Sequence, residues 1–259
     1  MPWQWLNAHG FDRGNDVLVV GKHDWPKDFT RDFTYFIFDV CDDHFETEHA
    51  EHYLLTCERA DLVTCNSPTM ALRIKDMTGR DAVVIPDPFE YERKLPHQGN
   101  LLWFGWRWNL KPLMRVMADL PDVPLEVVSE PGNTMVTPWS PENLQRAFST
   151  AGIVLIPVGN KKAKSANRMI EAINAGCFVV AEEMPAHNEF SPFAWIGDIG
   201  EGVRWALDHP DEALGATAMG QDYIDKHYSM DAIGPLWAKA IEGLYGTYKP
   251  ASVLETVQA

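Results

Sequence analysis

Short apolar runs recur along the first third of the chain and alternate with stretches of helical character. The runs are rich in β-branched residues and apolar on both faces, as strands buried inside a parallel sheet are. Between two of them, Ser67 and Pro68 supply a helix cap and a first-turn proline, and Gly79 can end that helix. We therefore expect a βαβ array with strands at residues 17–20, 35–38, 62–65 and 82–85 and helices at 47–59 and 67–79.

A polar, irregular stretch follows from Phe89 to Asn100 and contains Pro96 and Gly99. Such a stretch is typical of a linker between domains. The alternation then restarts, which predicts a second and fuller doubly wound unit. Its expected strands are 101–104, 125–128, 153–156, 177–180 and a short one near Trp195, with helices at 109–120, from 140, at 166–175 and onward to about 245.

Length and composition agree with an α/β protein made of two Rossmann-like, doubly wound parallel-sheet domains. The chain has 259 residues, of which 46% are hydrophobic and 23% charged. These values exclude collagen-like, low-complexity and mostly disordered chains. We place the domains at 1–90 and 101–245, with a linker at 91–100 and a tail at 246–259.

Neither export nor a membrane span is predicted. The N-terminus has no basic start followed by an apolar core, and no apolar run is long enough to cross a bilayer. The four cysteines show no CxxC spacing. We therefore expect a reducing, cytoplasmic location and no structural zinc site.

Charge is distributed unevenly along the chain. The net charge of −15 argues against broad binding to nucleic acid or to anionic lipid. From Asn143 to Ile170, however, the sequence has five basic residues and no acidic one. A basic island in an acidic protein predicts a site for a small anion. Its members are Arg146, Lys161, Lys162, Lys164 and Arg168.

The first candidate site is the loop at 161–168, which follows one predicted strand and leads into a helix. The N–H groups at a helix N-terminus bind phosphate, and the flanking lysines Lys161, Lys162 and Lys164 strengthen this binding. Glu171 lies on the same helix, away from its apolar stripe, where a carboxylate can accept both hydroxyls of a ribose. The alternatives are a solvated basic loop and an exposed glutamate.

A second candidate follows the strand at 101–104. Gly105 permits a turn in which backbone approaches a phosphate, and Arg107 or Lys111 can pair with that phosphate as a cation. Tryptophans at 103, 106 and 108 either belong to the core, which is the usual reading for each alone, or stack on a base or sugar.

Acidic residues and a histidine follow the strand at 35–38. Asp42, Asp43 and His44 can shift one another's pKa values into the range of proton transfer. They can equally cap the next helix or hold a divalent cation. His23, after the first strand, is either an acceptor contact or a lone surface histidine.

The run from Lys164 to Ala181 resembles the donor-binding signature of GT-B glycosyltransferases of the large GT4-like group: a Lys-Ser-x-Asn-Arg segment, a Glu-Ala helix, a glycine and a Val-Val-Ala strand. Other segments are similar to elements of the same group, and the likeness extends over residues 16–245. They are Ala60-Asp61-Leu62-Val63, Val84-Ile85-Pro86-Asp87-Pro88, Phe104-Gly105, and Tyr228-Ser229 followed by Trp237.

This resemblance implies a metal-independent enzyme that takes a nucleotide diphosphate sugar such as a UDP-sugar as donor, needs no further cofactor and retains the anomeric configuration. Lys164 and Ser165 would contact the diphosphate and Glu171 the ribose. To these we add Gly105, Arg107 and Asn167 as our own candidate donor contacts. Lys164 would act in catalysis, while Asp42, Asp43 and His44 would position the acceptor.

The sequence departs from the family at two points. Many relatives carry a second glutamate where this chain has Ala163, and their first domain is longer, so that the acceptor half here is abridged. A non-catalytic nucleotide-sugar-binding subunit and a sugar epimerase of the same fold are therefore alternatives. A glycan or a lipid-linked sugar is the expected acceptor, and modified DNA bases are a further alternative.

Overall fold

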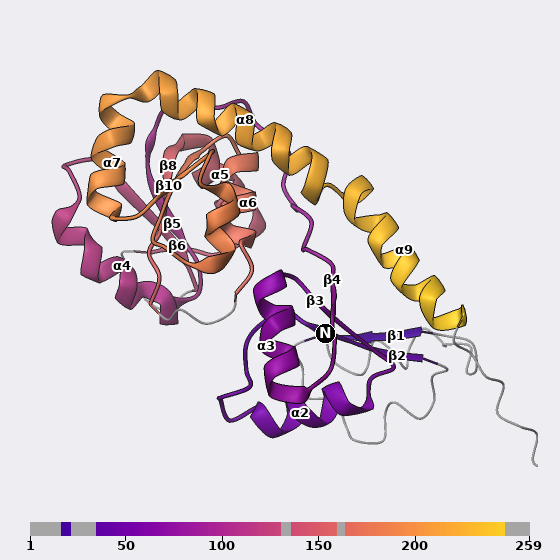
Figure 1. The fold of residues 1–259 in the computed structure, drawn as a ribbon. Helices are drawn as coiled ribbons and strands as arrows, with labels where there is room; N and C mark the ends of the chain where they lie inside the picture. The colour runs from indigo at the N-terminus through magenta and orange to yellow at the C-terminus, as the bar shows by residue number, and fades with distance from the viewer. Residues whose placement is uncertain (1–16, 22–34, 131–135, 160–163, 247–259) are drawn as a thin grey trace, which may run out of the picture.

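The computed structural model describes residues 17–21, 35–130, 136–159 and 164–246, and it contains two separate parallel sheets. The first sheet has the order β1-β2-β3-β4, and the second has the order β10-β9-β8-β5-β6-β7. The predicted α/β class with two parallel-sheet units is confirmed (Figure 1). The strands are β1 (Val17–Val20), β2 (Tyr35–Val40), β3 (Leu62–Cys65), β4 (Val83–Val84), β5 (Asn100–Phe104), β6 (Leu125–Ser129), β7 (Thr137–Pro138), β8 (Ala151–Ile156), β9 (Phe178–Ala181) and β10 (Trp195–Ile196).

Helices connect most of the strands, as parallel pairing requires. Within the described residues, no helix is both long and apolar enough to traverse a bilayer. The helices are α2 (Ala50–Arg59), α3 (Pro68–Thr78), α4 (Leu110–Val116), α5 (Pro141–Thr150), α6 (Asn167–Asn174), α7 (Ile199–Asp208), α8 (Pro210–Tyr228) and α9 (Met230–Gly246), with 3₁₀ turns η2 (Arg107–Asn109), η3 (Met117–Asp119) and η4 (Pro185–Phe190).

Several elements differ in their bounds from the sequence prediction. The helix expected at 109–120 is an α-helix only from Leu110 to Val116, and 3₁₀ turns flank it. The helix expected at 47 begins at Ala50, because the Thr47 hydroxyl accepts the His49 N–H and closes a turn before it. Strand β7 was not predicted, since two residues carry no recognisable period.

The second sheet is covered on both faces. Residues at alternate positions of a strand point to opposite faces. Leu102 and Phe104 of β5 pack with α5 and α6, whereas Leu101 and Trp103 pack with α4 and α7. Helices α4 and α6 therefore lie on opposite faces of this sheet.

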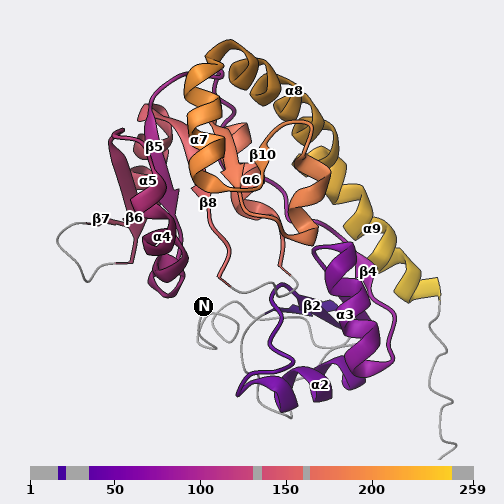
Figure 2. The same ribbon diagram turned by 60° about the vertical axis from the view of Figure 1, so that its left-hand side comes forward.

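The first sheet is covered partly by the end of the chain. Helices α2 and α3 pack on one face. Helix α9 leads away from the second unit and ends beside the first sheet (Figures 1 and 2), where Leu244 packs against Tyr35 and Ile37 on the other face. The C-terminal helix thereby joins the two units.

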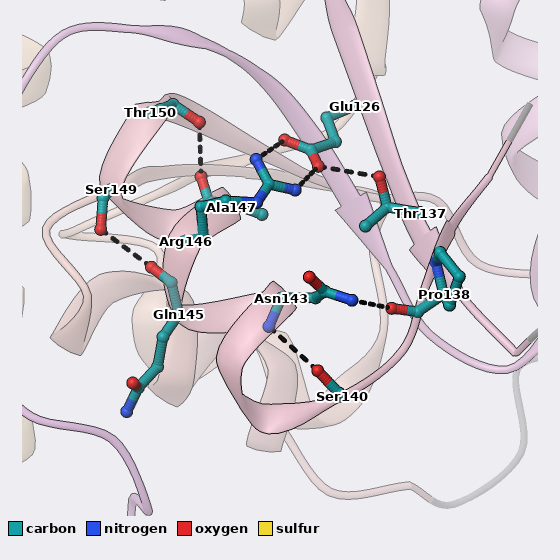
Figure 3. Close-up of polar contacts among 10 residues, drawn as sticks. All are labelled: Glu126, Thr137, Pro138, Ser140, Asn143, Gln145, Arg146, Ala147, Ser149 and Thr150. Atoms are coloured by element: carbon teal, nitrogen blue, oxygen red, sulfur yellow. Dashed lines mark hydrogen bonds and ion pairs between the residues drawn. The ribbon is translucent and has the colours of Figure 1, made fainter.

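Helix α5 starts at a strong cap that also fixes β7 beside β6. The Ser140 hydroxyl accepts the Asn143 N–H at 3.1 Å, and the Asn143 amide donates to the Pro138 carbonyl at 2.9 Å (Figure 3). Glu126 on β6 pairs with Arg146 and accepts a hydrogen bond from the Thr137 hydroxyl. Arg146 of the basic island is thus an ion-pair partner outside the candidate site.

We expect Ser140→Ala to lower the free energy of unfolding by about 1 kcal/mol, because it removes the N-cap acceptor of α5. Urea unfolding measures this loss. Ser140→Asp keeps an acceptor at the same position and should retain most of the stability. Equal losses in both variants would show that the cap does not stabilise the helix.

Candidate functional site

A cavity of about 520 Å³ opens at the carboxyl ends of β5 and β8. Read from β7 to β10, the second sheet has the strand order 3-2-1-4-5-6, in which the chain leaves β5 and β8 in opposite directions. Such a switch point leaves a crevice where ligands bind in open α/β sheets. Residues from both units line the cavity, among them Asp42, Gly105, Trp106, Trp108, Asn109, Lys111, Lys164, Ser165, Asn167, Arg168 and His187.

The N-terminus of α6 opens into this cavity. Ala166 is its N-cap residue, and no side chain caps the first turn. Lys164 and Ser165, directly before it, both line the cavity. The partial positive charge of a helix N-terminus and its N–H groups favour an anion here. The structure thus brings Lys164 and Ser165 to the same cavity as the helix end.

Arg168, at the end of the candidate loop 161–168, adds a charge to this cavity, although the sequence analysis gave it no contact of its own. Its Nη1 lies 3.4 Å from the Phe104 carbonyl oxygen at the end of β5. Burial lowers the pKa of Arg168 to about 10. Within the described part of the chain, no ion pair joins this guanidinium to a carboxylate. A half-buried cation on a cavity wall favours an anionic ligand. The signal in the sequence was its membership of the basic island.

His187 lies on the cavity wall as well, and the sequence analysis missed it. It is buried on η4, and its Nδ1 is 2.8 Å from the Glu182 carbonyl oxygen. Burial lowers the pKa of His187 below its usual range. A neutral imidazole at neutral pH can donate or accept a hydrogen bond there without adding charge.

The glycine turn after β5 is present, but the three tryptophans near it differ in burial. Gly105 has φ of +154°, and a Cβ atom there would lie 3.4 Å from the Trp103 ring. Trp103 is fully buried, whereas Trp106 and Trp108 are 62% and 72% exposed, so the core reading is wrong for those two. Arg107 is exposed and stacks on Trp108 with 4.6 Å from Cζ to the ring centroid, and it is not among the cavity-lining residues.

Asn167 links the cavity to the first unit. Its side-chain amide donates to Asp87 Oδ2 at 2.8 Å. The same oxygen accepts from the Asn66 amide at 3.2 Å, and Asn66 also donates to the Cys41 carbonyl at 2.9 Å. Asp87, on the segment between the two sheets, therefore connects the start of α6 to the loops after β2 and β3.

Glu171 lies further along α6, beside the linker. Its Oε1 accepts the Glu90 N–H at 2.7 Å, and within the described residues its buried Oε2 has no hydrogen-bond partner. Burial raises the pKa of Glu171 to about 7. Glu171 is not among the residues that line the cavity, and its ribose contact stays a prediction.

The two aspartates in the loop after β2 have different surroundings. Asp42 lines the cavity from the first unit. Asp43 is buried, accepts the Phe45 N–H and pairs with Arg73 Nε at 3.2 Å. The helix-cap reading is wrong, because the N-cap residue of α2 is His49.

His44 stands apart from that cavity and packs against other aromatic rings. Its ring lies edge-on to the rings of His49 and Tyr53. In the described ranges, no three His, Cys, Asp or Glu side chains gather as metal ligands. Lys161, Lys162, Ala163 and His23 lie outside the described residues.

No protein-family model matches the sequence, and no curated protein matches it significantly. The structure is similar to that of sucrose-phosphate synthase from Thermosynechococcus elongatus, with 14% identity and a TM-score of 0.63 over 83% of this chain and 69% of that one. An S. aureus TarM variant solved with UDP is 12% identical and gives a TM-score of 0.67, over 81% of this chain and 51% of TarM. Anabaena HepE in complex with UDP-glucose is 13% identical and gives a TM-score of 0.63, over 82% of this chain and 72% of HepE. At 12–14% identity the likeness shows the fold alone: this chain shares with these neighbours the GT-B fold of two parallel-sheet units.

The raised pKa of Glu171 predicts a pH-dependent stability. The folded protein keeps this proton up to about pH 7, whereas the unfolded chain loses it near pH 4.5. The stabilisation is therefore complete below pH 4.5 and is lost as the pH rises to 7. Relative to Glu171→Gln, the wild type should lose up to about 1.4 kcal/mol per pH unit in this window.

Urea unfolding of both proteins between about pH 5 and pH 8 measures the difference. Glu242→Gln, at an exposed position of α9, is the matched control and should follow the wild type. Parallel stability profiles of wild type and Glu171→Gln would contradict the shift.

Proposed function

We propose that this protein is a glycosyltransferase that moves a sugar from a nucleotide diphosphate sugar to an acceptor hydroxyl. The observation that carries the proposal is the gathering of positive charge at the switch-point cavity. Lys164, Arg168 and the uncapped N-terminus of α6 all face it. The GT-B fold and neighbours solved with UDP or UDP-glucose support the same reading.

The diphosphate is the part of the donor that fits this end of the cavity. When the bond to the sugar breaks, negative charge develops on the departing diphosphate. Lys164, the Ser165 hydroxyl and the N–H groups of α6 are placed to stabilise that charge. Arg168 and Lys111 add further positive charge on the same walls.

The nucleoside end of the donor belongs on the α6 side of the sheet. There Glu171 would accept the ribose hydroxyls. Because its Oε1 accepts the Glu90 N–H, the carboxylate has to turn from the linker to make this contact.

The acceptor approaches from the first unit. Of the three residues at 42–44, Asp42 lines the cavity, whereas Asp43 is held by Arg73. Asp42 is therefore the residue that we assign to positioning the acceptor hydroxyl. We assign the enzyme to the retaining, metal-independent GT4-like group, acting in the cytoplasm on a glycan or a lipid-linked sugar. The net charge of −15 disfavours a nucleic-acid acceptor.

A non-catalytic nucleotide-sugar-binding subunit is the second candidate. The observation that favours it is Ala163, which stands where the similar family often carries a glutamate. Incubation with saturating radiolabelled UDP-glucose and GDP-mannose separates the two. With a glycan acceptor added, release of free nucleotide diphosphate as the sugar passes to the acceptor or to water supports the enzyme, and binding without release supports the subunit.

We expect Arg168→Gln to weaken UDP binding about 10-fold or more, because a charge-assisted contact to the diphosphate is lost. Isothermal titration calorimetry measures the affinity. Arg146→Gln removes another member of the basic island, one paired with Glu126, and should stay within about 2-fold of the wild type. UDP affinity unchanged in a folded Arg168→Gln variant would place the diphosphate elsewhere.

For Glu171→Ala we expect about 10-fold weaker UDP binding, near 1.4 kcal/mol, from the loss of the ribose contact. Inorganic pyrophosphate, which has no ribose, should bind this variant and the wild type equally. Competition calorimetry compares the two ligands. An equal loss for both would mean that Glu171 shapes the cavity and does not touch the nucleoside.

A further inference from the structure

We propose that Trp106 and Trp108 form a platform on which a six-membered sugar ring stacks. The inference rests on the proposed function and deepens it, because it names the chemistry that this wall of the cavity recognises. Both side chains line the cavity, between the end of β5 and the start of α4.

The exposure of these two rings sets them apart from their neighbour. Trp103, on β5, is fully buried, whereas Trp106 and Trp108 are 62% and 72% exposed. An indole is a large apolar surface, and leaving two of them in water beside a cavity forfeits the stabilisation that burial supplies. Exposed apolar surface at a cavity mouth marks a binding site.

Trp108 is also restrained before any ligand arrives. Trp108 belongs to the 3₁₀ turn η2, and the Asn109 N–H donates to the Trp106 carbonyl at 2.8 Å. The Arg107 guanidinium stacks on the Trp108 ring at 4.6 Å. One face of Trp108 is thus occupied by Arg107, and a side chain already restrained in this way loses little further freedom when it binds.

The position of the pair relative to α6 favours a sugar over a nucleobase. Helix α6 and Glu171 lie on one face of the second sheet, and α4 lies on the other. A donor with its diphosphate at the end of α6 and its ribose toward Glu171 has its base on the α6 face. Trp106 and Trp108 lead into α4, so they meet the opposite end of the donor, where the sugar is attached.

The surrounding polar groups fit a neutral ring with hydroxyls at its edge. Asp42 and Asn109 line the cavity with the two tryptophans. A carboxylate accepts hydrogen bonds from hydroxyls but repels a phosphate. A pyranose offers C–H groups on its faces, which suit an indole, and hydroxyls at its rim, which suit Asp42 and Asn109.

This ring can be the transferred sugar of the donor or the terminal sugar of the acceptor. Calorimetry with UDP, UDP-glucose and, in the presence of saturating UDP, maltotriose separates these sources. The proteins compared are the wild type, the double variant Trp106→Ala/Trp108→Ala, the conservative Trp108→Tyr, and Met114→Ala as an exposed apolar control on α4.

We expect the double variant to bind UDP within about 2-fold of the wild type and to lose about 10-fold in affinity for one saccharide probe. A loss for UDP-glucose assigns the platform to the transferred sugar, and a loss for maltotriose assigns it to the acceptor. Trp108→Tyr should recover part of the affinity, and Met114→Ala should match the wild type.

Two results would overturn the platform: a 10-fold loss for UDP itself in the double variant, which would place the base or the phosphates on the indoles, or unchanged binding of both saccharide probes. If the wild type binds maltotriose but does not bind UDP, the proposed donor site is refuted and the platform is not.

Discussion

The candidate site depends on one arrangement of charge at the switch point of the second sheet. The carboxyl ends of β5 and β8, the uncapped end of α6 and the Arg168 guanidinium meet at one cavity. Placing positive charge in a half-buried position costs desolvation free energy, which a bound anion offsets. In a protein with a net charge of −15, the site is a local reversal of the overall field.

The rest of the fold brings the first unit to face this cavity. Helix α9 extends from the second unit and buries Leu244 against β2 of the first sheet. Asp87 accepts hydrogen bonds from Asn66 on one side and from Asn167 on the other. These two connections, one apolar and one polar, place Asp42 on the wall of a cavity that is otherwise built from the second unit.

Neighbouring residues of similar chemistry take different roles because their surroundings differ. Asp42 and Asp43 are adjacent, yet Arg73 and a backbone N–H satisfy Asp43, while Asp42 reaches the cavity. Trp103 is buried because it points toward α4 and α7 from the middle of a sheet. Trp106 and Trp108 follow the strand, where the chain turns away from the sheet, and they remain exposed.

The sequence by itself determined the α/β class, most strands and the excess of positive charge before α6, because runs of apolar residues, caps and a cluster of lysines and arginines are properties of neighbouring residues. It did not show β7, the cavity positions of Arg168 and His187, the bond between Glu171 and the Glu90 N–H, or which tryptophans are exposed. Only the tertiary structure decided these, because each depends on contacts between segments far apart in the chain: Arg168 with the end of β5, Glu171 with the linker and Asp43 with Arg73. The pattern of neighbouring residues indicates which face of its own helix or strand a side chain occupies. Which residue it contacts depends on how the helices and strands pack.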